Sequence, residues 1–144
     1  MTRYILDTDH VTLLQQVHPI VTQRISAVNC DDVGVTVVTV EEQVRGWLSA
    51  IRKTSQSSQP ERLIWAYRGL RDVVKYLSRL NLIDFSEEAY AHYQELRRQR
   101  IRIGTQDLRI AAIVLAENSI LVTRNQRDFV QVPGLVFEDW TVHN

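Results

Sequence analysis

Short apolar runs alternate along the chain with longer stretches in which apolar residues recur every three or four positions. The short runs have the length of strands, and the longer stretches have the period of amphipathic helices. The run at 33–38 is apolar on both faces, which is typical of a strand inside a sheet covered on both sides. The predicted strands are 3–6, 33–38, 82–85, 120–123 and 135–137, and the predicted helices span about 10–17, 19–28, 39–51, 60–79, 86–100 and 108–117.

Strands that alternate with helices predict an α/β fold, with one parallel sheet of about four to five strands and helices on both of its faces. Residues 1–144 are expected to form a single domain, because this length suits one hydrophobic core. The Ser-rich segment 53–60 is too short to link two domains and is predicted to be a turn between helices.

Local signals place three helix starts. Pro60 is expected at the first position of a helix, and Ser86 is expected to cap the helix that follows it. Thr39 and Glu42 match the capping-box pattern, which predicts that Thr39 is the N-cap of the helix after the second strand.

Charge and cysteine content limit the classes of function. The chain has 17 basic and 17 acidic residues, so it lacks the positive field of a protein that coats nucleic acid regardless of sequence. Cys30 has no internal partner, and no Cys or His spacing of the zinc type occurs. No apolar run approaches the roughly 18 residues of a membrane span, and the N-terminus does not resemble a signal peptide. We therefore expect a cytoplasmic protein with no membrane partner.

Four acidic residues are expected at one edge of the sheet. Asp7 ends the first strand, Glu42 opens the helix after the second, Asp107 enters from the start of the Ala-rich helix, and Asp128 follows a later strand. Ligands of parallel α/β sheets bind outside the carboxyl ends of the strands. Carboxylates gathered there repel one another unless a cation is present, and oxygen ligands suit Mg²⁺ or Mn²⁺. The pattern therefore predicts a divalent-metal site.

Each of these acids also has a purely local interpretation. Asp7 and Asp9 could be turn residues or helix N-caps, and Glu42 could serve only in the capping box. Asp107 could simply lie well in a helix dipole, and Asp128 could be a turn residue. The joint pattern favours a site, because four separate acids fall at one sheet edge.

The histidines and the cysteine offer no comparable constellation. His10, His18, His92 and His143 have neither triad nor metal-ligand spacing, so none is expected to be catalytic. Cys30 has no paired histidine in view, which leaves nucleophilic catalysis with weak support.

Four segments together resemble one known family, although each alone is weakly specific. They are Tyr4-Ile-Leu-Asp-Thr-Asp9, Val37-Val-Thr-Val-Glu-Glu42 followed by Gly46, Ile103-Gly-Thr-Gln-Asp-Leu-Arg-Ile-Ala-Ala112, and Leu121-Val-Thr-Arg-Asn-Gln-Arg-Asp-Phe129. In this order and spacing the chain resembles the PIN-domain ribonucleases, in particular the VapC toxins of prokaryotic toxin–antitoxin pairs. The resemblance covers essentially the whole chain. Of the two adjacent glutamates, Glu42 stands four residues before Gly46, as the E-x-x-x-G pattern requires.

The resemblance implies a three-layer PIN-like fold and a metal-dependent endoribonuclease that hydrolyses RNA phosphodiester bonds. Asp7 and Asp107 would bind Mg²⁺ or Mn²⁺, and Glu42 would support the metal or orient the attacking water. The cation would offset the charge that develops on the phosphate.

The fourth acidic position is ambiguous in this sequence. The family pattern places it either where this chain has Asn125 or three residues later, at Asp128. We expect Asp128 to carry the charge and Asn125 to orient water or substrate. Thr8 is expected to hydrogen-bond a metal-bound water or a phosphate oxygen. Arg124 and Arg127 could hold flanking phosphates, or they could belong to a solvated loop.

The resemblance also implies partners. VapC-like toxins form dimers and are inhibited by a VapB-like antitoxin, whose C-terminal tail lies along an apolar groove and reaches the acidic site. Trp47 and Trp65 flank the Ser-rich turn and are candidates for this groove, with core packing as the alternative.

Two other functions are open on sequence grounds. Asp7 and Asp9 after an apolar strand also resemble the nucleophile loop of haloacid-dehalogenase-like phosphatases, but Lys53 and Lys75 are the only lysines and neither is suitably placed. Alternatively, the domain is catalytically degenerate and binds RNA or protein, a possibility that Asn125 leaves open.

Overall fold

The sheet contains five parallel strands in the described part of the chain, residues 2–142 of a computed structural model. The central strand is β1 (Tyr4–Leu6), with β2 (Val33–Thr36) and β4 (Ile120–Val122) as its neighbours. The edge strands are β3 (Leu82–Ile83) and β5 (Phe137–Glu138). The predicted parallel sheet is confirmed, and all five carboxyl ends lie at the same edge.

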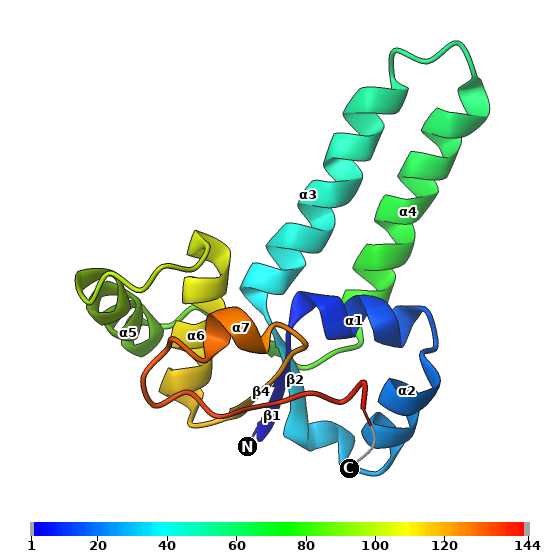
Figure 1. Cartoon of the computed structure of the whole chain (residues 1–144). Helices are drawn as coiled ribbons and strands as arrows, with labels where there is room; N and C mark the ends of the chain where they lie inside the picture. The colour runs from blue at the N-terminus through cyan, green and yellow to red at the C-terminus, as the bar shows by residue number, and fades with distance from the viewer. Residues whose placement is uncertain (1, 143–144) are drawn as a thin grey trace.

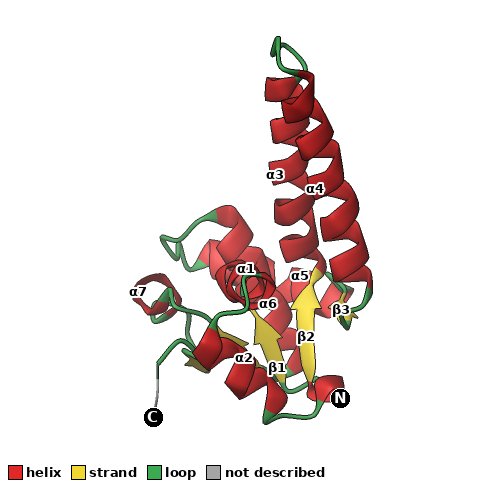
Figure 2. Cartoon of the chain, turned by 90° about the vertical axis from the view of Figure 1, so that its right-hand side faces the viewer, coloured by secondary structure: helices red, strands yellow, loops and turns green. Residues whose placement is uncertain are grey.

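Helices cover both faces of this sheet (Figures 1 and 2). They are α1 (Thr8–Gln15), α2 (Pro19–Ser26), α3 (Val37–Thr54), α4 (Pro60–Ser78), α5 (Glu87–Arg98), α6 (Thr105–Glu117) and α7 (Gln126–Phe129). Successive strand residues point to opposite faces. Ile5 of β1 therefore packs in a core with α5 and α6, whereas Leu6 packs in a second core with α1 and α4. The expected three-layer α/β fold is confirmed.

Two of the predicted helix starts are confirmed. Pro60 occupies the first turn of α4, where its missing N–H costs no hydrogen bond. The hydroxyl of Ser86 accepts the backbone N–H of Ala89 at 3.1 Å and so caps α5.

The predicted capping box at Thr39 is wrong. Strand β2 ends at Thr36, and the Thr36 hydroxyl accepts the backbone N–H of Thr39 at 3.2 Å, so Thr36 is the N-cap of α3. The expected strand through Val38 is therefore two residues too long. Val38 lies in the first helical turn and is buried in the core, where burial outweighs its preference for a strand. Glu42 consequently has no capping role.

Two segments that lie outside the predicted strands and helices contain short helical turns. Cys30–Asp32 form a single 3₁₀ turn before β2, and α7 follows β4. Phe129 of α7 is completely buried in the core beside α6. This anchor holds the polar start of α7 close to the carboxyl end of the sheet.

Helices α3 and α4 form a hairpin that projects beyond the sheet (Figure 1). The Trp47 ring of α3 packs directly on Gly69 of α4, where an added Cβ would lie 2.1 Å from Cζ3 of the indole. The Trp65 ring meets the Trp47 ring edge to face, with 5.1 Å between ring centres. Within residues 2–142, neither these helices nor any other is long and apolar enough to cross a membrane.

Candidate active site

Asp7 lies at the carboxyl end of the central strand, where three elements meet. Its side-chain Oδ1 accepts the backbone N–H of Thr8, so Asp7 is the N-cap of α1. Its Oδ2 accepts a hydrogen bond of 2.8 Å from the hydroxyl of Thr123, the residue after β4. The local interpretation of Asp7 as a helix cap is therefore correct, but it accounts for only one of the two carboxylate oxygens.

The Asp7 carboxyl is held in an unfavourable environment for a negative charge. Only 6% of the residue is exposed. Burial, then repulsion from Asp9 and more weakly from Asp107, raise its pKa from 3.8 to about 6, although the hydrogen bonds from Thr123 and Thr8 oppose this shift. A nearby cation would strongly stabilise the ionised form of such a carboxyl group.

Asp107 faces the same group of acids from the first turn of α6. Burial raises its pKa to about 6, with further repulsion from Glu42, Asp128 and Asp9. The acids that the sequence placed at one sheet edge therefore lie close enough to disturb one another's ionisation, with Asp107 among them. We call Asp7, Glu42, Asp107 and Asp128 the acidic cup.

Glu42 is oriented by two threonines from different helices. Its Oε1 accepts a hydrogen bond of 2.8 Å from the hydroxyl of Thr8, which also lies 3.0 Å from the hydroxyl of Thr39. Since Thr8 has a single hydroxyl proton and gives it to Glu42, Thr39 donates to Thr8. Glu41 instead accepts from Gln106 and pairs with Arg45, so Glu42 is the glutamate that faces Asp107.

Asn125 and Asp128, the two candidates for the fourth acidic position, contact each other. Nδ2 of Asn125 donates to Oδ2 of Asp128 at 3.0 Å, and the backbone N–H of Asn125 donates to the Thr123 hydroxyl. Asp128 is also one of the acids that repel Asp107. Arg124 contacts Asp9, and Arg127 is exposed on α7.

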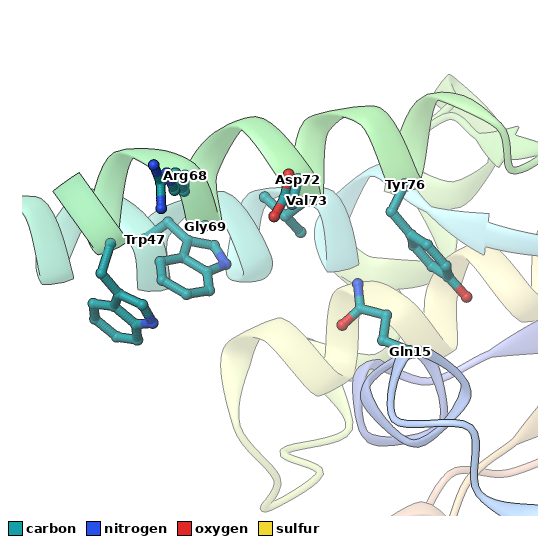
Figure 3. Close-up of a pocket in the computed structure, with 8 residues that line it drawn as sticks. Gln15, Trp47, Arg68, Gly69, Asp72, Val73 and Tyr76 are labelled. Atoms are coloured by element: carbon teal, nitrogen blue, oxygen red, sulfur yellow. The ribbon is translucent and has the colours of Figure 1, made fainter.

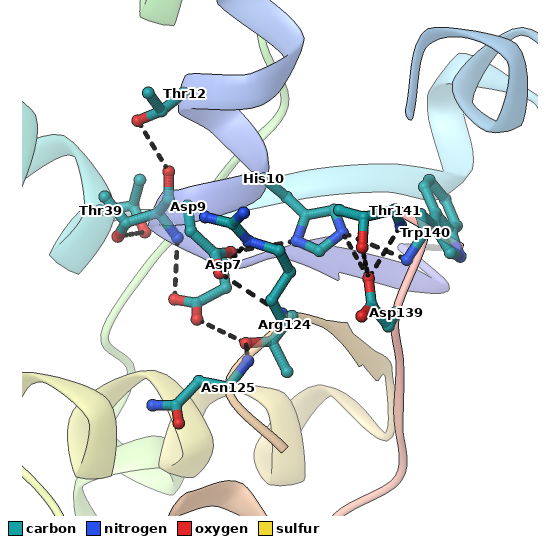
Figure 4. A network of polar contacts seen from close by, with 12 residues as sticks. Asp7, Asp9, His10, Thr12, Thr39, Arg124, Asn125, Asp139, Trp140 and Thr141 are labelled. Atoms are coloured by element: carbon teal, nitrogen blue, oxygen red, sulfur yellow. Dashed lines mark hydrogen bonds and ion pairs between the residues drawn. The ribbon is translucent and has the colours of Figure 1, made fainter. Parts of the chain in front are cut away.

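Sequence reasoning did not identify the role of Thr123, Asp9 or His10. Thr123 follows β4 just as Asp7 follows β1, so the strand-end rule could have found it. His10 is completely buried and contacts both Asp9 and the backbone of Trp140 (Figure 4). No local pattern connects His10 with a residue 130 positions away. His143 lies outside the described residues.

The donor set suits a hard divalent cation. Among residues 2–142, no three His, Cys, Asp or Glu side chains are close enough together to hold a metal ion as they stand. Mg²⁺ commonly takes only one or two direct carboxylates and retains several waters. Asp7 and Asp107 supply oxygen donors whose ionisation is suppressed by burial and by repulsion from neighbouring acids. These two residues therefore fit such an ion.

Comparison with known proteins assigns the chain and its fold to a family. Residues 4–135 match the PIN domain family. Ribonuclease VapC2 of Haemophilus influenzae is 31% identical, over 97% of this chain and 99% of that protein. The chain belongs to the PIN-domain family, among the VapC ribonucleases. Ribonuclease VapC2 of Rickettsia felis is 44% identical over 69 residues, which are 45% of this chain and 52% of that protein.

The tertiary structure of this PIN domain agrees with its sequence relatives. The crystal structure of DNA-bound VapBC from Salmonella typhimurium has a chain that is 26% identical, with a TM-score of 0.74, over 97% of this chain and 99% of that one. The resemblance stated from the four sequence segments is confirmed. The phosphatase alternative gains no support, because Lys53 and Lys75 of this PIN domain lie on α3 and α4, within the hairpin.

Proposed function

We propose that the chain is a divalent-metal-dependent endoribonuclease and the toxin of a toxin–antitoxin pair. One observation carries the catalytic part of this proposal. Asp7 and Asp107, on different elements at the carboxyl edge of the sheet, both have a pKa raised to about 6 by burial and by neighbouring acids. A cluster of this kind is costly without a cation, and a VapC ribonuclease has a use for one.

Asp7 and Asp107 would hold Mg²⁺ or Mn²⁺ through their carboxylate oxygens. When bound, such an ion supplies an acidified water and offsets the negative charge that develops on a phosphate. Thr123 and the N–H of Thr8 keep the Asp7 oxygens oriented toward the cup. Thr8 fixes Oε1 of Glu42, which leaves Oε2 to accept a hydrogen bond from the attacking water and align it.

The β4–α7 segment would hold the RNA. Asp128 fixes the amide of Asn125, whose carbonyl oxygen remains available to a substrate hydroxyl or a water. Arg124 and Arg127 lie on the exposed side of this segment and would pair with phosphates that flank the scissile bond.

An antitoxin segment would bind beside the hairpin. A cavity of about 480 Å³ lies between α1, α3 and α4, and Trp47, Trp65, Arg68 and Tyr76 are among its lining residues (Figure 3). Trp65 is 58% exposed even though one part of its ring packs against Trp47, which leaves a large apolar surface open to solvent. The cavity offers aromatic walls and an arginine to an extended peptide that carries apolar and acidic side chains. A homodimer, which the family resemblance implies, is part of the same proposal.

The catalytic proposal is tested by incubating the purified protein with single-stranded RNA in Mg²⁺ or Mn²⁺. Cleavage should be lost with EDTA and in Asp7→Asn, but not in Asp31→Asn, a carboxylate at the opposite end of β2. Sequencing the RNA ends produced in cells by wild type and Asp7→Asn would identify the target. Equal activity of Asp7→Asn and wild type would refute the proposal. No cleavage of several RNAs in either ion would instead favour a binding module.

A further inference from the structure

A chain of hydrogen bonds leads from the C-terminal segment to an arginine at the rim of the acidic cup (Figure 4). The backbone N–H of Trp140 donates to Nε2 of His10 at 3.2 Å, and Nδ1 of His10 lies 3.0 Å from Oδ1 of Asp9. Oδ2 of Asp9 accepts both the backbone N–H and the Nε–H of Arg124, each at 3.4 Å. These contacts thus join Trp140, the adjacent residues Asp9 and His10, and Arg124 in one chain of hydrogen bonds.

The hydrogen bonds define the direction of this chain. A backbone N–H can only donate, so Nε2 of His10 accepts and the ring proton lies on Nδ1, where it donates to Asp9. The ring is completely buried, and the acids that face it are Asp9 and, at 3.7 Å from Nε2, Asp139. His10 therefore holds Asp9 in one orientation from inside the protein.

Asp9 lies in the first turn of α1, where a carboxylate suits the helix dipole, but that role does not require its contacts with His10 and Arg124. It does not cap α1, because Asp7 does, and its side chain accepts only from His10 and Arg124 among residues 2–142. It also raises the pKa of both Asp7 and Asp107, so its charge is unfavourable for the cup itself. The contacts of Asp9 with His10 and Arg124 offset this unfavourable effect on Asp7 and Asp107 and point to a role in holding Arg124.

We propose that Asp9, held by His10, is a positioning residue that fixes Arg124 as a phosphate-binding group for the RNA strand beside the scissile bond. Asp9 uses Nε and the backbone N–H of Arg124, while neither terminal amino group of Arg124 has a hydrogen-bond partner among residues 2–142. The side chain is 52% exposed, so these two groups are open to a ligand. The inference rests on the proposed ribonuclease function.

The physical reason for such a restraint is competition within the site. A free arginine next to the cup would be drawn toward Asp7 and Asp107, where it would exclude a metal ion. Asp9 gives the guanidinium a nearer carboxylate and keeps it at the rim. Fixing the side chain in advance also reduces the conformational entropy lost when RNA binds.

The decisive variant is Asp9→Asn, because two explanations predict opposite results. Removing a negative charge near RNA should strengthen binding if Asp9 acts only through its charge. If Asp9 positions Arg124, the same change should weaken binding. We expect the Kd for a short single-stranded RNA, measured by fluorescence anisotropy in an Asp7→Asn background, to rise about threefold to fivefold, and about tenfold in Arg124→Ala.

A double-mutant cycle separates positioning from a general structural effect. In the Arg124→Ala variant, the further change Asp9→Asn should not raise the Kd for RNA any more. The same should hold for His10→Phe, which replaces the imidazole by a ring of similar size without a hydrogen-bond donor. In the active protein at saturating Mn²⁺, each change should raise KM and leave kcat within about twofold. Glu95→Gln, which removes the carboxylate paired with Arg98 on α5, is the control and should change neither.

Three results would overturn the inference. The first is tighter or unchanged RNA binding by Asp9→Asn, and the second is a Kd of the double variant that is raised by the product of the two single effects. The third is a fall in kcat with no change in KM. The binding measurement does not depend on cleavage. Absence of cleavage by wild type would refute the proposed catalytic function, while the binding cycle would still decide the role of Asp9.

Discussion

The hydroxyl of Thr123 donates a hydrogen bond of 2.8 Å to Oδ2 of Asp7, a residue 116 positions earlier in the chain. The bond joins the ends of two neighbouring strands and is completely buried on the threonine side. It is also one of the interactions that lower the pKa of Asp7 against the effect of burial. The protonation state of Asp7, the candidate metal ligand, thus depends on Thr123, a neutral residue.

We expect Thr123→Val to impair cleavage through the pKa of Asp7. Without the hydroxyl, that pKa should rise above about 6, so a larger fraction of Asp7 is protonated at neutral pH. From a pKa of about 6, a rise of one unit should lower cleavage at pH 7 about twofold and a rise of two units about tenfold, and part of the loss should be recovered at pH 8.5. A pH–rate profile measures both effects. Thr123→Ser keeps the hydroxyl and should follow wild type, whereas an equal loss in both variants would contradict the assignment.

In metal-free buffer, the protein should become more stable as the pH falls from 7.5 to 5. The folded-state pKa values of Asp7 and Asp107 are about 6, above the ordinary value of 3.8. The folded state therefore binds more protons than the unfolded state in this window, and the free energy of unfolding rises on acidification. The buried Asp7 alone should contribute about 1 to 2 kcal/mol. Denaturant titrations at several pH values measure the slope.

Asp7 and Asp107 take up protons between pH 7.5 and 5, whereas Asp9 does so only at lower pH. Burial of Asp9 opposes its ionisation, but hydrogen bonds from His10 and Arg124 hold the pKa of Asp9 below its ordinary value. Protonation of Asp9 therefore destabilises the folded protein, but only at lower pH.

Asp107→Asn should be more stable than wild type at pH 7.5 and show a shallower dependence of stability on pH, while losing cleavage. A less stable Asp107→Asn would show that the acids do not repel one another in the folded protein.

Mn²⁺ should raise the unfolding temperature of wild type but hardly that of Asp7→Asn. An ion that binds only the folded state stabilises it by about 2.7 kcal/mol at a concentration one hundred times its Kd. For a chain of this length, that corresponds to a rise of several degrees, measurable by differential scanning calorimetry. Asp31→Asn should shift like wild type. Equal shifts in Asp7→Asn and wild type would mean that the ion binds elsewhere.

Two glycines of the hairpin should respond in opposite ways to alanine. An alanine Cβ at Gly69 would meet the Trp47 ring at 2.1 Å, whereas at Gly46 nothing lies within 4 Å. Gly69→Ala should therefore lower the free energy of unfolding by about 1 to 3 kcal/mol. Gly46→Ala should raise it by up to about 1 kcal/mol, because alanine favours a helix. Urea denaturation of both variants checks this, and similar values would contradict the close packing of the two helices.

Local chemistry in the sequence determined most of the fold. Apolar runs of strand length alternate with helical spacing, and Ser86 and Pro60 mark helix starts through hydrogen bonds or dihedral angles within a few residues. The rule that ligands bind at the carboxyl ends of parallel strands then brought Asp7 and Asp107 to one edge. The mutual effects on the pKa of these acids agree with that placement.

Only the tertiary structure decided which local preference prevailed and which distant groups meet. Thr36 rather than Thr39 caps α3, because burial of Val38 outweighs the strand preference of the β-branched run. The link from Trp140 through His10 to Asp9 joins residues that no periodicity relates, since its geometry arises only when the C-terminal segment packs against α1. The sequence by itself determined the architecture and the edge at which the acids gather. Long-range hydrogen bonds, which depend on three-dimensional distance and not on spacing along the chain, decided how each side chain is held.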